Sequence, residues 1–185
     1  MSVSAAIASL ATYSQDELLS VIETPKGSRN KYGFNENLRA FTLKKVLPRG
    51  MLFPYDFGFI PATEGEDGDP LDVLVLLDEP APMGCVVPIR AIGAIEAKQR
   101  QKKGGWLRND RLIAVATHAK LHSGVSDLKE INPQILDEIE AFFRDYNEQE
   151  GKEFKPLKRC GPKAALRLID EGRRRRRDSK RSAER

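Results

Sequence analysis

Short strand-like segments, bounded mostly by Gly, Pro or Asp, fill residues 18 to 117 and limit the folds open to this chain. They alternate between apolar and polar residues or are continuously apolar, as sheet strands are, and irregular loops separate them. Strands in this arrangement favour a small antiparallel barrel over repeated strand–helix–strand units. The predicted strands are Leu18–Thr24, Ala40–Leu47, most of Phe53–Ile60, Asp72–Leu77, Cys85–Ala97 and Arg111–Thr117.

The hydrophobic period changes in the last third of the chain. Asn132 followed by Pro133 is a helix start, and the residues Ile135, Ile139, Phe142 and Tyr146 then recur at helical spacing. This helix is predicted to end near Glu150, before Gly151. A second helix is predicted to open at Gly161–Pro162, with Ala165, Leu166 and Ile169 facing inward. Two terminal helices on a barrel make one α+β domain.

Length and composition indicate one globular domain, which we expect to span residues 1–171. The 185 residues are 40% apolar and 31% charged, which is ordinary for such a domain. We expect no membrane association, because no apolar run approaches the roughly 18 residues of a membrane span. The N-terminus does not resemble a signal peptide. Cys85 and Cys160 are expected to be free thiols in a cytoplasmic protein.

The positive charge is concentrated at the C-terminal end. The formal net charge is +4, yet residues 172–185 hold eight basic side chains and only two acidic ones, so the rest of the chain is mildly acidic. Consecutive like charges repel, and we therefore expect residues 172–185 to be a disordered tail. This tail is either a solvated end without function or a segment that binds nucleic acid or another acidic partner.

An acidic loop runs directly into one of the predicted strands. Asp67, Asp69 and Asp72 fall within six residues, Gly68 permits a tight turn, and Pro70 fixes the backbone. A crowded set of carboxylates repels itself unless a cation lies among the oxygens, and Mg²⁺ prefers such ligands. The alternative is a solvated Asp-Gly turn at the start of a strand.

The run from Asp67 to Val75 closely resembles the signature of the soluble family I inorganic pyrophosphatases. The likeness extends from about Val21 to Ile169 through several ordered blocks. It implies a five-stranded OB-like β-barrel with flanking C-terminal helices, Mg²⁺-dependent hydrolysis of pyrophosphate to two phosphates, with Mn²⁺ as an alternative metal, and a homo-oligomer. The blocks are Val21–Pro25, Lys31–Tyr32, Phe53–Pro54, Asp56–Ile60, Leu112–Val115, Lys120–Leu121 and Phe142–Tyr146.

The resemblance also implies a role for individual residues. Asp67, Asp72 and Glu23 would hold the metals, with Asp110 as a further ligand after a one-residue slip. Asp69 would act as general base. The residues that would bind phosphate oxygens are Lys31, Lys45, Arg111 and Tyr146.

Several positions depart from the family pattern, and the departures weaken the metal site. Gly33 stands where the family usually has Glu, and Lys45 stands where it has a phosphate-binding Arg. The loop ahead of Leu112, which carries acids in the family, is basic here. Phe53, Phe57 and Asn147 are further departures.

We therefore expect a slow inorganic diphosphatase. The alternative is a non-catalytic descendant that binds phosphate, nucleotides or RNA. It would use the basic segment 98–111, Trp106 and the arginine-rich end.

Overall fold

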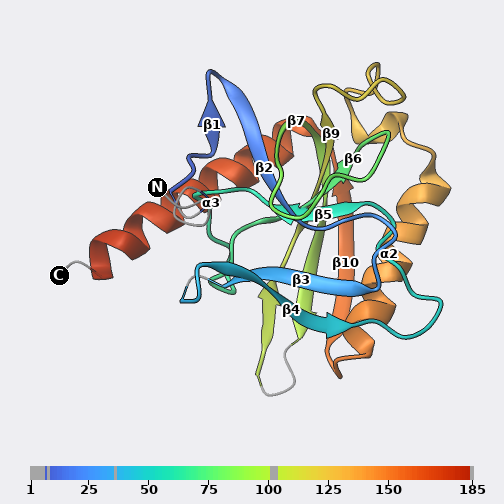
Figure 1. Ribbon diagram of the computed structural model, residues 1–185, viewed down its shortest axis with the longest axis horizontal. Coiled ribbons are helices and arrows are strands. Elements are labelled where there is room, and N and C mark those ends of the chain that lie inside the picture. The colour runs from blue at the N-terminus through green and yellow to red at the C-terminus, as the bar shows by residue number, and fades with distance from the viewer. Residues whose placement is uncertain (1–6, 8, 36, 101–103, 184–185) are drawn as a thin grey trace.

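The computed structural model describes residues 7, 9–35, 37–100 and 104–183 (Figure 1). Among these residues, five strands close into a ring in which each pairs with the next and β7 returns to β2. All pairings in the ring are antiparallel except that of β6 with β9. The predicted five-stranded barrel of an α+β protein is confirmed. In ring order the strands are β2 (Glu17–Thr24), β5 (Asp56–Phe59), β6 (Asp72–Leu76), β9 (Arg111–Ala116) and β7 (Val86–Arg100).

Further strands extend the barrel. β1 (Tyr13–Ser14) pairs with β2, and β8 (Trp106–Arg108) pairs with β7. β3 (Asn30–Asn35) and β4 (Ala40–Val46) form a separate hairpin. β10 (Glu153–Cys160) pairs with β7 and was not predicted, because only one of its side chains, Phe154, is fully buried and its pattern is mostly charged.

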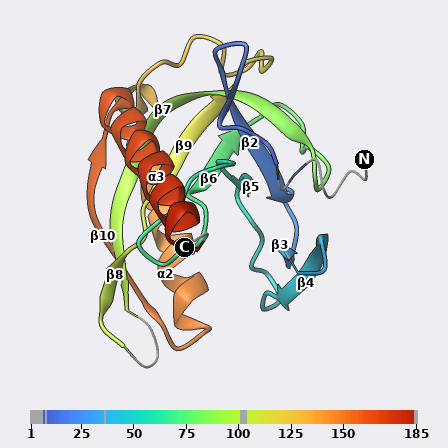
Figure 2. The ribbon, with the colours of Figure 1, turned by 90° about the vertical axis from the view of Figure 1, so that its left-hand side faces the viewer.

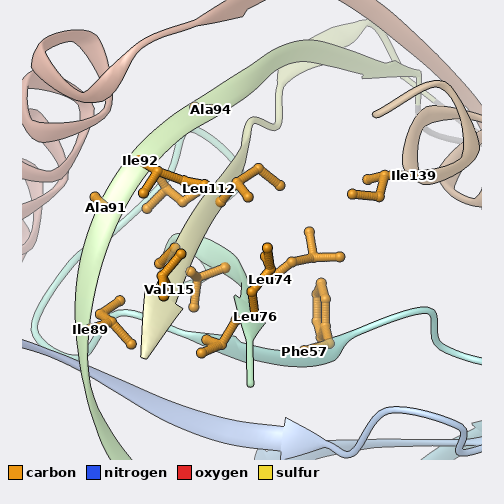
Figure 3. Packing of buried hydrophobic residues seen from close by; sticks show 14 of the residues in the cluster. Phe57, Leu74, Leu76, Ile89, Ala91, Ile92, Ala94, Leu112, Val115 and Ile139 are labelled. Carbon is orange, nitrogen blue, oxygen red and sulfur yellow. The ribbon is translucent and has the colours of Figure 1, made fainter. Parts of the chain in front are cut away.

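The core fills the barrel. β6 and β9 read as continuous apolar runs because nearly all of their residues are buried on both faces. Figure 3 shows Leu74, Leu112 and Val115 within the ring, with Ile139 of α2 facing them. Burial of this kind contributes about 1.5–3 kcal/mol for each large apolar side chain. The core therefore fixes the strand ends on which the acidic loop is mounted.

Two helices flank the barrel as predicted, after a short 3₁₀ turn, η1 (Leu128–Glu130). α2 (Pro133–Glu148) starts where Asn132 accepts a hydrogen bond from the backbone N–H of Gln134 at 3.0 Å. α3 (Pro162–Ala183) packs against β7. Its residues Ala165 and Ile169 are buried, but Leu166 is 42% exposed, so its predicted inward orientation is wrong. The buried stripe follows the i, i+4 spacing, which excludes Leu166.

The C-terminal end differs from the disorder that we expected for residues 172–185. α3 continues to Ala183 (Figure 2). Arginine is a good helix former, and ion pairs between Arg173 and Asp170 (3.2 Å) and between Arg175 and Glu171 (3.9 Å) offset the repulsion between like charges. Arg176 also pairs with Glu64, 3.6 Å away, outside the helix.

Two smaller expectations can be compared with the structure. In the described part of the chain, no helix combines the length and the apolar character that a membrane span requires. Both cysteines, Cys85 and Cys160, are free thiols, as predicted.

Candidate active site

A single cavity of about 880 Å³ gathers nearly all of the predicted site residues. Its walls come from the acidic loop, the ends of β2, β6 and β9, the β3–β4 hairpin, α2 and the C-terminal part of α3. Elements far apart in sequence therefore build one site. The predicted residues that line it are Glu23, Lys31, Lys45, Asp67, Asp69, Asp72, Arg111 and Tyr146.

The acidic loop is a compact turn. Gly68 has a φ of +86°, a conformation that residues with a Cβ rarely adopt. The backbone N–H of Gly65 donates to the carbonyl of Asp69 at 2.7 Å, and the backbone N–H of Asp69 donates to Oδ1 of Asp67 at 3.2 Å. Asp72 is the first residue of β6. The turn thus brings Asp67 and Asp69 back towards the strand end that carries Asp72.

Asp72 is held by a buried cation. Its Oδ2 lies 2.7 Å from the Nη1 atom of Arg111, and the Arg111 side chain is only 4% exposed. The guanidinium lies over the rings of Phe143 (4.7 Å) and Phe154 (5.4 Å). Burial raises the pKa of Asp72 to about 6, although Arg111 opposes the shift. The ion pair therefore stabilises charge in a place where burial disfavours it.

Asp67 is held by an amide. Nδ2 of Asn109 donates to Oδ2 of Asp67 at 3.1 Å and to Oε1 of Gln99 at 3.2 Å, while Oδ1 of Asn109 accepts from Arg111. Burial and the charge of Asp69 raise the pKa of Asp67. Asn109 was not among the predicted site residues, although its place two residues before the predicted phosphate ligand Arg111 was a usable signal.

Asp110 does not line this cavity, so the geometry lends no support to its predicted place among the metal ligands. Its carboxylate accepts the backbone N–H of Ala97 at 2.9 Å and both oxygens lie 2.9 Å from Nε of Arg108. It lines a small adjoining cavity of about 100 Å³, whose wall also includes Asp67 and Asp72. Asn109 and Arg111 line the main cavity, whereas Asp110, which lies between them in the sequence, does not.

The oxygen ligands suit a divalent cation in their chemistry. Four carboxylates (Glu23, Asp67, Asp69 and Asp72) line one cavity, and Mg²⁺ prefers such oxygens. In the arrangement of the described residues, however, no three acidic, His or Cys side chains lie close enough together to hold a metal ion. Protein donors occupy the carboxylates instead: Arg111, Asn109 and Lys31. A metal ion would therefore compete with these donors for the carboxylates.

Basic and aromatic side chains line the same cavity as the acids. Nζ of Lys31 lies 2.9 Å from Glu23 and 4.1 Å from the ring centre of Phe57. Nζ of Lys45 lies 3.2 Å from the ring centre of Tyr146. Burial lowers the pKa of Lys45 and raises that of Tyr146, so the Tyr146 hydroxyl keeps its proton. Both groups can therefore donate hydrogen bonds to an anion.

Two lining residues near the end of α2 escaped the sequence analysis. Oε1 of Glu150 pairs with Lys45 at 2.7 Å, and its Oε2 pairs with Lys152 at 2.9 Å. Lys152 adds a positive charge to the cavity lining, which also includes Asn147. The side-chain amide of Asn147 donates a hydrogen bond to the backbone carbonyl of Phe143. No local pattern marks these residues, because the turn between α2 and β10 sets their place.

Gly33 makes room for another lysine. A Cβ at Gly33 would lie 2.8 Å from Cε of Lys44, so the lysine stem crosses the space that a side chain would fill. Lys44 lines the cavity, and in the described residues it makes no ion pair. A cation has therefore replaced the acid expected at this wall.

Comparisons with known proteins give a consistent result. A sequence profile described as "Inorganic pyrophosphatase" matches residues 20–177. The chain is 42% identical over 132 residues to an inorganic pyrophosphatase of Nostoc sp., covering 71% of this chain and 75% of that protein. It is 37% identical over 151 residues to one of Synechocystis sp., covering 82% and 86%. The solved inorganic pyrophosphatase of Thermus thermophilus superposes with a TM-score of 0.83 at 32% identity, covering 92% and 98%.

Proposed function

The chain belongs to the inorganic pyrophosphatase family, and on that basis we propose that it is an inorganic diphosphatase whose site is the cavity around Asp67, Asp69 and Asp72. It hydrolyses pyrophosphate to two phosphates, as the relatives named for that activity indicate. The observation that supports the site is the meeting of these three carboxylates with Lys31, Lys45 and Tyr146 in one cavity.

Asp67, Asp72 and Glu23 would hold Mg²⁺, with Mn²⁺ as an alternative, and Asp110 is not part of this set. The bound metal would supply positive charge to the substrate and a lowered pKa to a bound water. The protein provides the oxygen ligands and the buried Arg111 that keeps Asp72 ionised. Arg111 is engaged with Asp72, so we assign it the positioning of that carboxylate rather than direct contact with phosphate.

Asp69 would accept the proton of the attacking water. It lies at the tip of the loop, lines the cavity, and its carboxylate accepts no hydrogen bond within the described residues. A free carboxylate at this position can take a proton without first giving up a partner. Lys31, Lys45 and Tyr146 would donate to phosphate oxygens and stabilise the charge that grows on the leaving phosphate.

We expect the rate to be below that of relatives with a complete set of acids. Each lost contact to the reacting group typically lowers the rate by a factor of about 10²–10³. Here Asn109 occupies a position beside Asp67, and Lys44 occupies the space at Gly33. Added positive charge near the carboxylates also weakens metal binding.

Phosphate release from pyrophosphate in the presence of Mg²⁺ or Mn²⁺ tests this function. The Asp69→Asn variant should be at least about 100-fold slower than the wild type. Glu66→Gln is the matched control, because Glu66 is exposed in the same loop, does not line the cavity, and only accepts the backbone N–H of Arg108. It should stay within about threefold of the wild type. No release above background at high enzyme concentration would refute the proposal.

The non-catalytic alternative receives less support. Its basic segment is largely neutralised where the structure describes it, because Arg100, Arg108 and Arg111 pair with Glu153, Glu96 and Asp72 respectively. Lys102 and Lys103 lie outside the described residues. The curated relatives are named as enzymes. Binding of nucleic acid through the arginine-rich end stays a prediction.

We also propose that the protein is a cytoplasmic homo-oligomer. The β3–β4 hairpin and the residues beside it expose Leu38 (67%), Leu43 (55%) and Val46 (53%), and apolar groups gathered on one element are typical of subunit contacts. The free thiols of Cys85 and Cys160 suit a reducing compartment. Light scattering after size-exclusion chromatography would give the number of subunits.

A further inference from the structure

The C-terminal part of α3 belongs to the wall of the active-site cavity. Arg176 and Lys180 both line it, together with the acidic loop and the β3–β4 hairpin. They are four residues apart and therefore lie on one face of the helix. Figure 2 looks towards the C-terminal end of α3 and shows the β3–β4 hairpin to its right. The helix therefore contributes two basic side chains to the site, and this contribution was not predicted from the sequence.

The docking of α3 fixes where these groups lie. The backbone N–H of Glu64 donates to the carbonyl of Gly172 at 3.0 Å, and a Cβ at Gly172 would lie 2.8 Å from Cδ1 of Leu71. Further along the helix, the hydroxyl of Ser179 donates to Glu64 at 2.6 Å, and Arg176 pairs with the same carboxylate at 3.6 Å. These contacts hold the helix against the segment that leads into the acidic loop.

Lys180 brings an uncompensated charge to the cavity. Within the described residues its ammonium group makes no ion pair or hydrogen bond, and Lys44 across the site is in the same state. The lining as a whole holds seven basic side chains and five acidic ones. The cavity is therefore net cationic even with all of its carboxylates ionised, which favours a ligand with many negative charges.

The cavity is larger than a diphosphate requires. Its volume of about 880 Å³ lies in the upper part of the range of roughly 300–1,000 Å³ found for pockets that enclose drug-sized ligands. A diphosphate held at Lys31 and Tyr146 would leave the part of the cavity beside α3 open. Lys180 lines this cavity without a partner among the described residues and is therefore available to a longer phosphate chain.

We propose that Lys180, supported by Arg176, forms a subsite for a third phosphoryl group, so that the cavity accepts linear triphosphates as well as diphosphate. The inference rests on the proposed function and extends its substrate class. In hydrolysis, the oxygen of water bonds to the terminal phosphorus and the bond to the bridging oxygen breaks. The electron pair leaves with the diphosphate, phosphate is the other product, and the released proton passes to Asp69 and then to solvent.

Equilibrium binding to the full chain tests the subsite without turnover. Isothermal titration calorimetry would measure tripolyphosphate and pyrophosphate with metal removed by EDTA and at constant ionic strength. We expect tripolyphosphate to bind more tightly than pyrophosphate. The Lys180→Gln variant should bind tripolyphosphate about tenfold more weakly, as expected for one lost charged contact, and should bind pyrophosphate unchanged.

Arg174→Gln is the matched control. It removes the same charge from the same helix, but Arg174 lies on a different face and donates to the carbonyl of Asp170. Its binding of both ligands should equal that of the wild type. Equal weakening by the two variants, or equal weakening of both ligands by Lys180→Gln, would overturn the subsite, because either result reports only general attraction.

Titration with ATP distinguishes a subsite for nucleoside triphosphates from one for inorganic phosphate chains. Affinity for ATP that depends on Lys180 as tripolyphosphate affinity does would extend the subsite to nucleotides, whereas such dependence for tripolyphosphate alone would restrict it to inorganic chains. Because binding is measured without catalysis, an inactive protein with Lys180-dependent binding would contradict the diphosphatase proposal alone. An active protein without that dependence would contradict the subsite alone.

Discussion

The two walls of the active-site cavity carry opposite charges. One wall, made by the acidic loop, the start of β6 and β2, presents Asp67, Asp69, Asp72 and Glu23. The other, made by β4, the turn before β10 and α3, presents the lysines Lys44, Lys45, Lys152 and Lys180.

Two carboxylates of the acidic wall form ion pairs with basic side chains of the protein. Arg111 holds Asp72 and Lys31 holds Glu23. The comparison teaches that cations of the protein compensate the carboxylates of this cavity and exceed them in number. Such cations weaken metal binding but strengthen the binding of phosphate anions.

The largest effect is expected on the free energy of unfolding, from the buried Phe143 side chain that packs beneath residues of the cavity. Phe143 is 1% exposed, lies under Arg111 and contacts the rings of Tyr146 and Phe154. Phe143→Ala should lower the free energy of unfolding by about 3–5 kcal/mol through loss of buried area and creation of a cavity. Urea denaturation measures it. Leu157→Ala, at a side chain that is 47% exposed, should change it by less than about 0.5 kcal/mol. Similar small losses in both variants would show that the walls do not depend on this ring.

Asp72, which lines the main cavity, and Asp110, which does not, allow a role in the site to be separated from a role in stability. Asp72→Asn should lower kcat/KM for pyrophosphate on the order of 100-fold, or about 2.7 kcal/mol, because a metal-holding oxygen is lost. Asp110→Asn should leave kcat/KM within about threefold while lowering stability, because Asp110 binds Arg108 and Ala97 away from the cavity. An equal loss of rate in both variants would return Asp110 to the site.

Adding an acid beside Asp67 should strengthen the binding of metal ions in the cavity. Asn109→Asp places a carboxylate beside Asp67 and should raise Mn²⁺ affinity about tenfold, or about 1.4 kcal/mol. Electron paramagnetic resonance of free Mn²⁺ follows the binding. Asn35→Asp adds the same charge outside the cavity and should leave the affinity unchanged. If both variants bind Mn²⁺ as the wild type does, the loss of this acid is not what weakens the site.

The smallest effect is expected on the pH dependence of stability, through Glu150 beside the lysines of the basic wall. Burial alone would raise the pKa of Glu150, but hydrogen bonds from Lys45 and Lys152 outweigh it and lower the pKa. A lowered carboxyl pKa adds stability that is present above the ordinary value of about 4.3 and is lost as pH falls through the folded-state pKa.

Glu150→Gln should therefore cost at most about 1 kcal/mol at pH 7, because the pair is partly exposed. Below about pH 4 the difference between variant and wild type should shrink. Thermal melts at both pH values measure this. A constant difference across the range would mean that the carboxylate charge contributes nothing.

The sequence by itself determined the elements and the inner acids. Apolar periodicity is a local property, so it located β2, β6, β9 and α2 to within a few residues of their bounds. The turn residues Gly68 and Pro70 likewise fixed the acidic loop at the mouth of β6. The family resemblance added the closure of the barrel, which the pairing of β2 with β7 confirms.

Only the tertiary structure decided how charges meet across the cavity. Contacts formed only in the fold engage Asp110 with Arg108 and Ala97 and bring Asn109 to Asp67. Contacts with Glu64 bring α3, which we had expected to end in disorder, to the cavity with Lys180. Charge runs and short basic strands carry no apolar period, so their positions depend on distant partners that a linear sequence does not show.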